Sequence, residues 1–309
     1  MKKHTFSILL MTVLLLSACT GRRSAAVRTE VKVPRVFVPA LPPAALADNE
    51  ARIEYMREHY WDNLDFTDTA FFAETDTMAM VEAYAGYVGA FLTPDDAEAI
   101  TRLMDKASAT KYAFDYFSML AEKVLYDPNS PLRNDELYIP VLEAQVASPL
   151  LDKYEKLAPE YNLLLARQNR IGRKANDFRF TDTDGRRGSL YGLKAEYTLI
   201  FFNNPGCHMC KEITEALCAS PMLNEMVENG RLKILALYPD EDLAEWTAYR
   251  ENIPSKWLNA YDKGTTIRNG NLYDLKAIPA LYLLDAEKRV LIKDSTDVGY
   301  IEYVIDHRE

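Results

Sequence analysis

Two cysteines, Cys207 and Cys210, stand at C-x-x-C spacing within the stretch "NNPGCHMCKE". Thiols at this spacing can bind a metal ion, close a redox-active disulfide, or simply be two buried side chains. A tetrahedral zinc site usually has four ligands. The chain offers one such pair and four histidines, of which His208 lies between the cysteines, too close to be a natural third ligand. The pattern therefore disfavours zinc, whereas copper(I), which accepts two thiolates, stays open as an alternative.

The residues around the pair favour a redox disulfide. The apolar run "YTLIFF" (197–202) predicts a strand, and "CHMCKEITEALCA" predicts a helix directly after it. Cys207 would then stand at the start of a helix, where free N–H groups and the helix dipole favour a thiolate. Cys210 lies one turn deeper and can reach back to close the disulfide. Pro205 and Gly206 suit the tight turn between strand and helix.

A proline later in the chain supports the same interpretation. Ile278-Pro279 stands just before "ALYLLD", which predicts another strand. X-Pro bonds are the peptide bonds for which the cis form is accessible. A trans proline that ends a loop is the plainer alternative.

These segments resemble a known family. From about residue 175 to 309 the chain is similar to the extracytoplasmic thiol–disulfide oxidoreductases of the TlpA/ResA type, through "ANDFRFTDTDGRRGSL", the strand "YTLIFF" before "CHMC", and "YDLKAIPALYLLDAEKRVL". The resemblance implies an α/β thioredoxin-like domain, a central mixed sheet flanked by helices, over residues 173–309. It also implies that Cys207 exchanges with a partner's sulfur, that Cys210 resolves the mixed disulfide, and that a cis Pro279 beside them shapes the site for the partner's backbone. No cofactor or metal is expected.

Three positions depart from the family pattern. Gly206 stands where thioredoxins carry an aromatic residue, and Phe201 stands where they bury an aspartate. Ile213 occupies the position at which the TlpA/ResA type often has a glutamate. Glu212, one place earlier, is a candidate proton acceptor for Cys210, and a solvated carboxylate on the helix face is the alternative.

Three further residues of the same predicted helix carry expectations of their own. A protonated His208 would stabilise the Cys207 thiolate and make the pair a better oxidant; plain exposure is the alternative. We expect Met209 to pack against the sheet. Cys218 is about 16 Å further along the helix at ~1.5 Å per residue, too far to pair with either cysteine, and we expect it to be a buried thiol.

The elements that position these residues can be read from the same half of the chain. Asp184-Gly185 predicts a hairpin turn, and "RLKILALY" (231–238) predicts a second apolar strand. Ser220 and Pro221 restart a helix, "DEDLAEWTAYREN" and "TTIRNGNLYDLK" predict two more, and "ALYLLD" with "RVLIKD" predicts an antiparallel pair before a last helix in "VGYIEYVIDH". Strands that alternate with helices predict an α/β sheet covered on both faces.

Residues 48–172 predict an all-α domain. Apolar residues recur at helical spacing, and Thr93 with Pro94 predicts an N-cap and first helical position. The segments "REHYWDNLDFTD" and "LYDPNSPLRNDELYIPVLEA" resemble a helical domain of unknown function that precedes a thioredoxin-like domain in Bacteroidota lipoproteins. We expect this domain to position a partner or to dimerise.

The first 47 residues predict export and anchoring. Residues 1–18 have the charged start and short apolar run of a signal peptide, too short to span a bilayer. "LSAC" resembles the lipobox of bacterial lipoproteins, which implies cleavage before Cys19 and lipid attachment to its sulfur; an ordinary signal peptide with an accidental cysteine is the alternative. Residues 19–47 would be the lipidated cysteine and a proline-rich tether. The protein would then be extracytoplasmic and membrane-anchored, facing the periplasm in a Gram-negative bacterium, where disulfides persist.

Charge and composition limit the partners. The chain has 309 residues with 36 Lys and Arg against 46 Asp and Glu, a net charge of −10. An acidic chain without a basic block argues against nucleic acid, whose phosphates must be neutralised. The expected partners are exported protein thiols or disulfides and a redox partner protein. A non-catalytic scaffold lipoprotein that holds copper(I) is the rival hypothesis.

Overall fold

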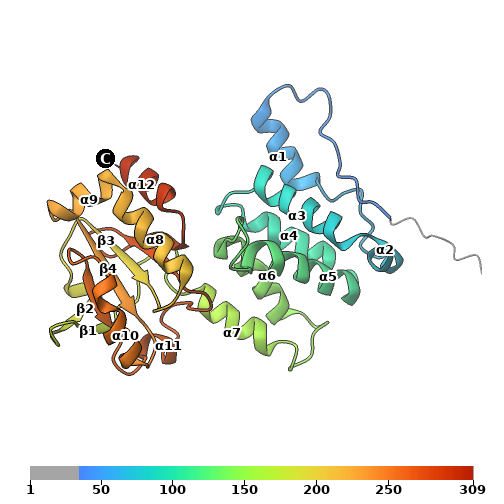
Figure 1. Ribbon diagram of the computed structural model, residues 1–309. Coiled ribbons are helices and arrows are strands. Elements are labelled where there is room, and N and C mark those ends of the chain that lie inside the picture. Colours follow the sequence, from blue (N-terminus) through green and yellow to red (C-terminus); the bar gives the residue numbers. More distant parts are fainter. Residues whose placement is uncertain (1–34, 309) are drawn as a thin grey trace, which may run out of the picture. The chain divides into compact units, whose positions relative to one another are not determined.

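The structure, a computed structural model, describes residues 35–308. Cys19, the predicted signal peptide and the first part of the predicted tether lie outside these residues. Figure 1 traces the described chain from helices α1–α7, drawn blue to green, into the strands and helices drawn yellow to red. We call residues 35–172 the helical region and residues 173–308 the sheet region. The two regions belong to one compact unit, and each has hydrophobic cores of its own.

The helical region is all-α, as the sequence predicts. Several of its helices begin after a residue whose side chain accepts a hydrogen bond from a free backbone N–H group of the first turn, among them Asp48, Asp76 and Asn134. The elements are α1 (Asn49–His59), α2 (Thr69–Glu74), α3 (Thr77–Phe91), α4 (Ala97–Ala107), α5 (Lys111–Ala121), a π-helical turn (Glu122–Tyr126), α6 (Asp135–Ala147) and α7 (Leu157–Ala166).

The predicted start of α4 is wrong. The N-cap residue is Asp96, not Thr93, and the helix begins at Ala97. The Asp96 carboxylate accepts hydrogen bonds from the Thr93 N–H group (2.7 Å) and hydroxyl (2.8 Å). Thr93 therefore lies in the turn before the helix.

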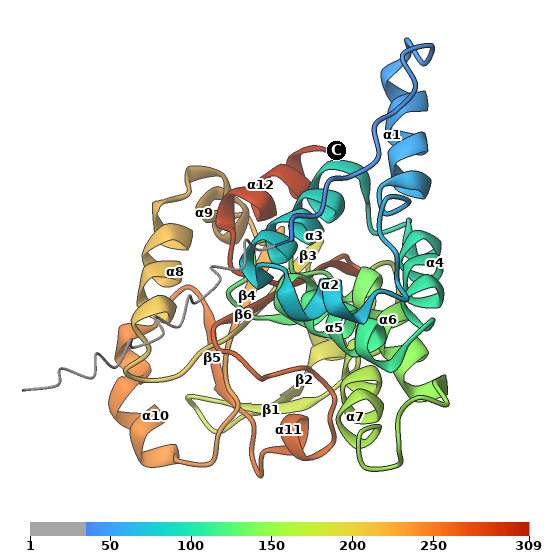
Figure 2. The ribbon, with the colours of Figure 1, turned by 90° about the vertical axis from the view of Figure 1, so that its right-hand side faces the viewer.

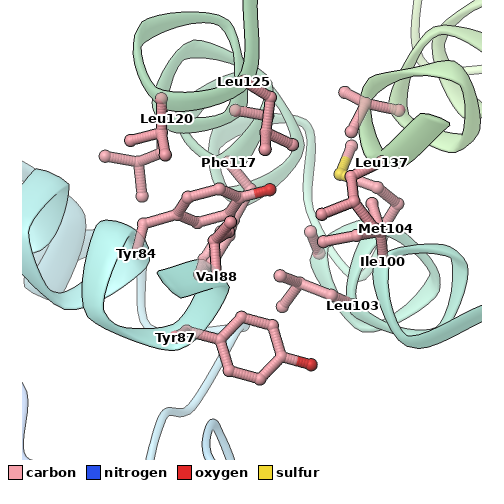
Figure 3. Close-up of a cluster of buried hydrophobic side chains, with 14 of the residues drawn as sticks. Tyr84, Tyr87, Val88, Ile100, Leu103, Met104, Phe117, Leu120, Leu125 and Leu137 are labelled. Carbon is pink, nitrogen blue, oxygen red and sulfur yellow. The ribbon is translucent and has the colours of Figure 1, made fainter. Parts of the chain in front are cut away.

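Aromatic and aliphatic side chains fill the core of the helical region. Tyr84 and Val88 of α3 meet Ile100 of α4 and Phe117 of α5 in this core (Figure 3). Trp61 packs edge-on against Phe117, with ring centroids 5.1 Å apart. Burial of this apolar surface is the main force that holds seven short helices together.

Residues 35–47, which the sequence predicts to be tether, lie against the helices. The Phe37 ring stacks on Trp61 at 4.7 Å, and the Ala40 N–H group donates to the Tyr60 carbonyl at 3.2 Å. Arg35 forms an ion pair with Asp68.

The sheet region is built on a mixed seven-stranded sheet with strand order β2-β1-β5-β4-β3-β6-β7. Parallel pairs join β3, β4 and β5, and the other neighbours are antiparallel. The predicted central mixed sheet is therefore confirmed. Its strands are β1 (Arg179–Asp182), β2 (Arg187–Ser189), β3 (Tyr197–Phe202), β4 (Leu232–Tyr238), β5 (Leu258–Tyr261), β6 (Ala280–Leu284) and β7 (Val290–Ser295).

Helices cover both faces of this sheet (Figure 2). Leu199 and Phe201 of β3 face a core shared with α8 (His208–Ala219), α9 (Pro221–Glu228) and α12 (Val298–Asp306). Ile200 and Phe202 face the opposite core, to which α11 (Thr266–Asn269) contributes Ile267. Because successive side chains of a strand point to opposite faces, a strand buried on both sides is apolar throughout, as "YTLIFF" nearly is.

The strand β5 was not predicted. Its four residues, "LNAY", include only two aliphatic side chains, although a turn at Pro254 separates the strand from α10 (Leu243–Tyr249). It forms because β4 pairs with it in parallel over four residues.

Candidate redox site

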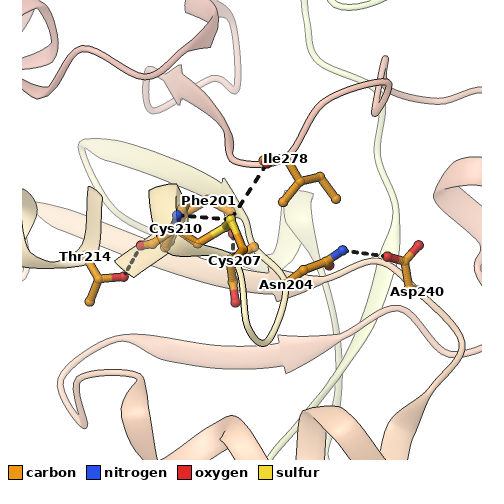
Figure 4. Close-up of a disulfide and its surroundings, with 8 residues drawn as sticks. Phe201, Asn204, Cys207, Cys210, Thr214, Asp240 and Ile278 are labelled. Atoms are coloured by element: carbon orange, nitrogen blue, oxygen red, sulfur yellow. Dashed lines mark hydrogen bonds between the residues drawn. A yellow bond between two sulfur atoms is a disulfide. The ribbon is translucent and has the colours of Figure 1, made fainter. Parts of the chain in front are cut away.

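The cysteine pair lies where β3 gives way to α8. Cys207 is the N-cap residue of α8, and its sulfur accepts a hydrogen bond from the Cys210 N–H group at 3.1 Å. The two sulfurs form a disulfide, with the Cα atoms 5.2 Å apart (Figure 4). Cys207 is partly exposed, whereas Cys210 is 1% exposed. One sulfur can thus be reached by a partner while the other is protected.

Gly206 explains one departure from the family pattern. Its φ is +72°, in the left-handed region that costs other residues conformational energy. A Cβ atom there would have nothing within 4 Å, so the backbone conformation, and not a lack of space, favours glycine. The turn that delivers Cys207 to the helix start therefore depends on this residue.

The predicted proline lies beside the disulfide. The Ile278-Pro279 peptide bond is cis, which confirms that expectation. The Cys207 sulfur lies 3.8 Å from the Ile278 carbonyl oxygen. Residues at the N-terminus of α8 and residues before β6, far apart in sequence, thus form a single site.

The surroundings of the buried sulfur are apolar. Cys210 belongs to the same core as Phe201 and Ile213, the two positions at which the family pattern leads one to expect acids. Glu212 lies on the exposed side of α8, where its carboxylate is 3.4 Å from His208 Nδ1, with side chains 52% and 85% exposed. Glu212 and His208 are therefore solvated on the outer face of the helix.

Two predictions about burial on α8 are wrong. Met209 is 49% exposed and does not pack on the sheet, and Cys218 is an exposed free thiol. The cause is the phase of the helix: Cys210, Ile213 and Leu217 face the sheet, and residues adjacent to them in sequence are rotated by about 100° away from it. This apolar stripe was the signal that could have placed both residues correctly.

A cluster of charged residues joins the segment before Pro279 to the helical region, and no sequence pattern predicted it. Arg133, just before α6, lies 3.5 Å from the buried Asp274 carboxylate and also forms an ion pair with Asp294 of β7. Lys276 lies 3.2 Å from Asp274, and its ammonium stands over the Tyr126 ring, 3.1 Å from the centroid.

Burial dominates the electrostatics of this cluster. It raises the pKa of Asp294 to about 6; Arg133 opposes the shift, and the carboxylates of Asp274 and Asp135 add to it. Lys293, the neighbour of Asp294 in β7, pairs with Asp135 at 2.8 Å. The cluster therefore connects the helical region to both β7 and the segment that carries Pro279.

Within residues 35–308, no group of three or more His, Cys, Asp or Glu residues is arranged to hold a metal ion. Over the same part of the chain, none of the helices has the length and apolar character needed to cross a membrane.

Comparisons with known proteins agree with this geometry. Residues 18–169 match a family described as a domain of unknown function, DUF5106. A thioredoxin-like protein from Bacteroides caccae, known from its crystal structure, is 43% identical; the match covers 89% of this chain and 100% of that chain with a TM-score of 0.83. The C-terminal domain of an uncharacterized protein from Bacteroides fragilis is 49% identical, over 44% of this chain and 98% of that chain, with a TM-score of 0.43.

A curated relative points to the chemistry. The thiol-disulfide oxidoreductase ResA from Bacillus cereus is 28% identical over 126 residues, which are 40% of this chain and 68% of that protein. The chain thus spans the whole of the Bacteroides caccae protein and most of ResA. The protein therefore belongs to the thioredoxin-like family of thiol–disulfide oxidoreductases, in a form in which a DUF5106 region precedes the thioredoxin-like domain.

Proposed function

We propose that this protein is a membrane-anchored, extracytoplasmic oxidoreductase that exchanges disulfides with exported proteins through Cys207 and Cys210. The observation that carries the proposal is the asymmetry of the pair. Cys207 is partly exposed at the N-terminus of α8 beside the cis Ile278-Pro279 bond, and Cys210 is buried within bonding distance. An accessible sulfur beside a protected one is what a two-step exchange needs.

The exchange proceeds through a mixed disulfide. In the reduced protein the Cys207 thiolate attacks one sulfur of a partner disulfide, a new S–S bond forms, and the partner's other sulfur leaves as a thiolate. The Cys210 thiolate then attacks the Cys207 sulfur, which restores the Cys207–Cys210 disulfide and releases the partner with both sulfurs reduced. The same steps in reverse oxidise a partner dithiol, and a separate redox partner protein returns the pair to its starting state.

Neighbouring side chains adapt the site to this exchange. The free N–H groups at the start of α8 favour the Cys207 thiolate, and a protonated His208 would add to this effect. Met209, exposed between the two cysteines, offers a flexible apolar contact to the partner. Pro279 shapes the surface on which the partner's backbone lies. Glu212, solvated on the outer face of α8, is given no role in the exchange.

The location of the reaction follows from residues outside the described part of the chain. Residues 1–18 direct export, and Cys19 becomes the lipidated N-terminal residue of the mature protein. Two or more acyl chains anchor a protein stably, whereas one chain is marginal. The protein would then work on the extracytoplasmic side of the membrane, in a compartment in which partner disulfides persist.

An insulin-reduction assay with dithiothreitol as the electron source tests this proposal. Cys207→Ser removes the attacking sulfur, so the rate should fall to that of dithiothreitol alone. Cys218→Ser is the matched control, because Cys218 is an exposed thiol on the same helix that takes no part in the exchange. Activity of Cys207→Ser equal to that of the unaltered protein would refute the proposed function.

A further inference from the structure

A cavity lies beside the redox site, at the junction of the two regions. Its volume is about 560 Å³, within the range of binding pockets in proteins. The helical region lines it with Pro128, Pro131 and residues 133–136, and the sheet region lines it with Ala277, Pro279 and residues 292–297. We call this space the junction cavity.

Pro279 belongs to both the junction cavity and the redox site. It lines the cavity, and the Ile278 carbonyl that precedes it lies 3.8 Å from the Cys207 sulfur. A partner joined to Cys207 through a mixed disulfide therefore has the residues next to its own cysteine close to the cavity. The cavity is thus placed to contact a segment of that partner.

The backbone that borders the cavity suits an extended segment. The strand β7 is the last strand at its side of the sheet. The start of β7 is covered, since Gly172 N–H donates to the Val290 carbonyl at 2.8 Å and Val290 N–H donates to the Arg173 carbonyl at 2.9 Å. The rest of β7, from Ile292 to Ser295, lines the cavity instead. A strand edge of this kind accepts a further extended chain.

The charges of the lining indicate which side chains such a segment carries. Four carboxylates line the cavity (Asp135, Glu136, Asp294 and Asp297), against the two cations Arg133 and Lys293. Arg133 and Lys293 are held in ion pairs by Asp294 and Asp135 respectively. Glu136 is held by Arg170, which lies outside the lining. Carboxylates therefore still outnumber cations around the cavity by one, and Asp297 is exposed to a bound segment. Tyr300, half-exposed on α12, adds an aromatic ring to the lining, and ammonium and guanidinium groups bind to such rings.

We propose that the helical region forms one wall of the partner-binding site, and that the junction cavity binds an extended, lysine- or arginine-bearing segment next to the partner's reactive cysteine. This proposal rests on the proposed function, because it assumes that a partner reacts at Cys207. It gives the helical region a role in selecting partners.

The test uses two synthetic peptides, each with one cysteine activated as a mixed disulfide with thionitrobenzoate. One peptide carries lysines on both sides of the cysteine, and the other carries glutamates at the same positions. All variants are made in a Cys218→Ser background, because the exposed Cys218 thiol would also react. Attack of the reduced protein's Cys207 thiolate releases coloured thionitrobenzoate, and the second-order rate constant of this single turnover is measured for each peptide. We expect the lysine peptide to be preferred by about two- to tenfold, the range for one or two partly screened ion pairs.

Matched variants separate the cavity from the general negative charge of the protein. Glu136→Gln removes a lining carboxylate, and the lysine preference should fall by about half or more. Glu143→Gln is the control: Glu143 lies on the same helix and also pairs with an arginine, Arg167, but does not line the cavity. Tyr300→Ala should lower the rate constant for the lysine peptide, whereas Tyr303→Ala, at a similarly exposed tyrosine of α12 that does not line the cavity, should lower it less.

Reduction of the small disulfide 5,5′-dithiobis(2-nitrobenzoate) reports on the redox site without the cavity. If that reaction needs Cys207 but the two peptides react equally, or Glu136→Gln and Glu143→Gln change the preference equally, the cavity proposal fails and the proposed function stands. If the small disulfide reacts as fast with Cys207→Ser as with the unaltered protein, the proposed function itself fails.

Discussion

The buried Asp294 leads to a quantitative prediction about pH. Burial raises its pKa from 3.8 to about 6 in the folded protein. A folded-state pKa above the unfolded value means that, between these two values, the folded protein binds more protons than the unfolded chain, so stability falls as pH rises. A difference of about two pKa units corresponds to about 3 kcal/mol in total, of which about 2 kcal/mol falls between pH 4.5 and 7.5.

Asp294→Asn should remove this dependence while it keeps the shape of the side chain. The free energy of unfolding, from urea titrations followed by circular dichroism, should rise in the variant relative to the unaltered protein by about 2 kcal/mol between pH 4.5 and 7.5. Arg133→Met provides a second check with the same method. Arg133 lowers the pKa of Asp294, so its removal should make the unfolding free energy fall more steeply as pH rises.

A constant difference in unfolding free energy between Asp294→Asn and the unaltered protein across that pH range would contradict a raised pKa of Asp294. Such parallel curves would mean that Asp294 titrates alike in the folded and unfolded states. The pairing with Arg133 would then not be the buried contact that joins the two regions.

Three further predictions concern the helix that carries the pair. Gly206→Ala should destabilise the protein by about 1 kcal/mol in urea, because alanine is strained at a φ of +72°; an unchanged midpoint would contradict the turn geometry. In the oxidised protein a maleimide should label Cys218 while Cys207 and Cys210 react only after reduction, as peptide mass mapping can show, and protection of Cys218 would contradict its exposure. His208→Ala should lower the reduction potential of the Cys207–Cys210 pair, measured in glutathione buffers, because a protonated His208 favours the reduced, thiolate form of Cys207. An unchanged potential would mean that His208 does not stabilise the thiolate.

The local elements of the sheet region were predictable because their signals lie within short stretches of sequence. The turn at Asp184-Gly185, the apolar strand 197–202 and the restart at Ser220 each have the residues that their backbone geometry requires. The prediction of a cis bond before Pro279 depended on the family resemblance, since an isolated Ile-Pro pair does not specify the isomer.

The features that the sequence did not reveal depend on contacts between distant residues. The strand β5 exists through its pairing with β4 and β1 and has little apolar character of its own. Arg133, Asp274 and Asp294 come from three separate segments. Charged residues are rarely buried unless they are paired, so a sequence without known contacts predicts that each of them is solvated. No local pattern could have brought these three together beside the redox site.

In the proposed exchange, Cys207 forms the bond with the partner and Cys210 breaks it. Cys210→Ser removes the second step, so a mixed disulfide should accumulate when the reduced variant is mixed with an oxidised protein such as insulin. Mass spectrometry of the trapped complex should place the partner's cysteine on Cys207, and Cys207→Ser combined with Cys210→Ser should trap nothing at this site. A complex joined through Cys218, or an equal yield from the double variant, would mean that Cys207 is not the attacking sulfur.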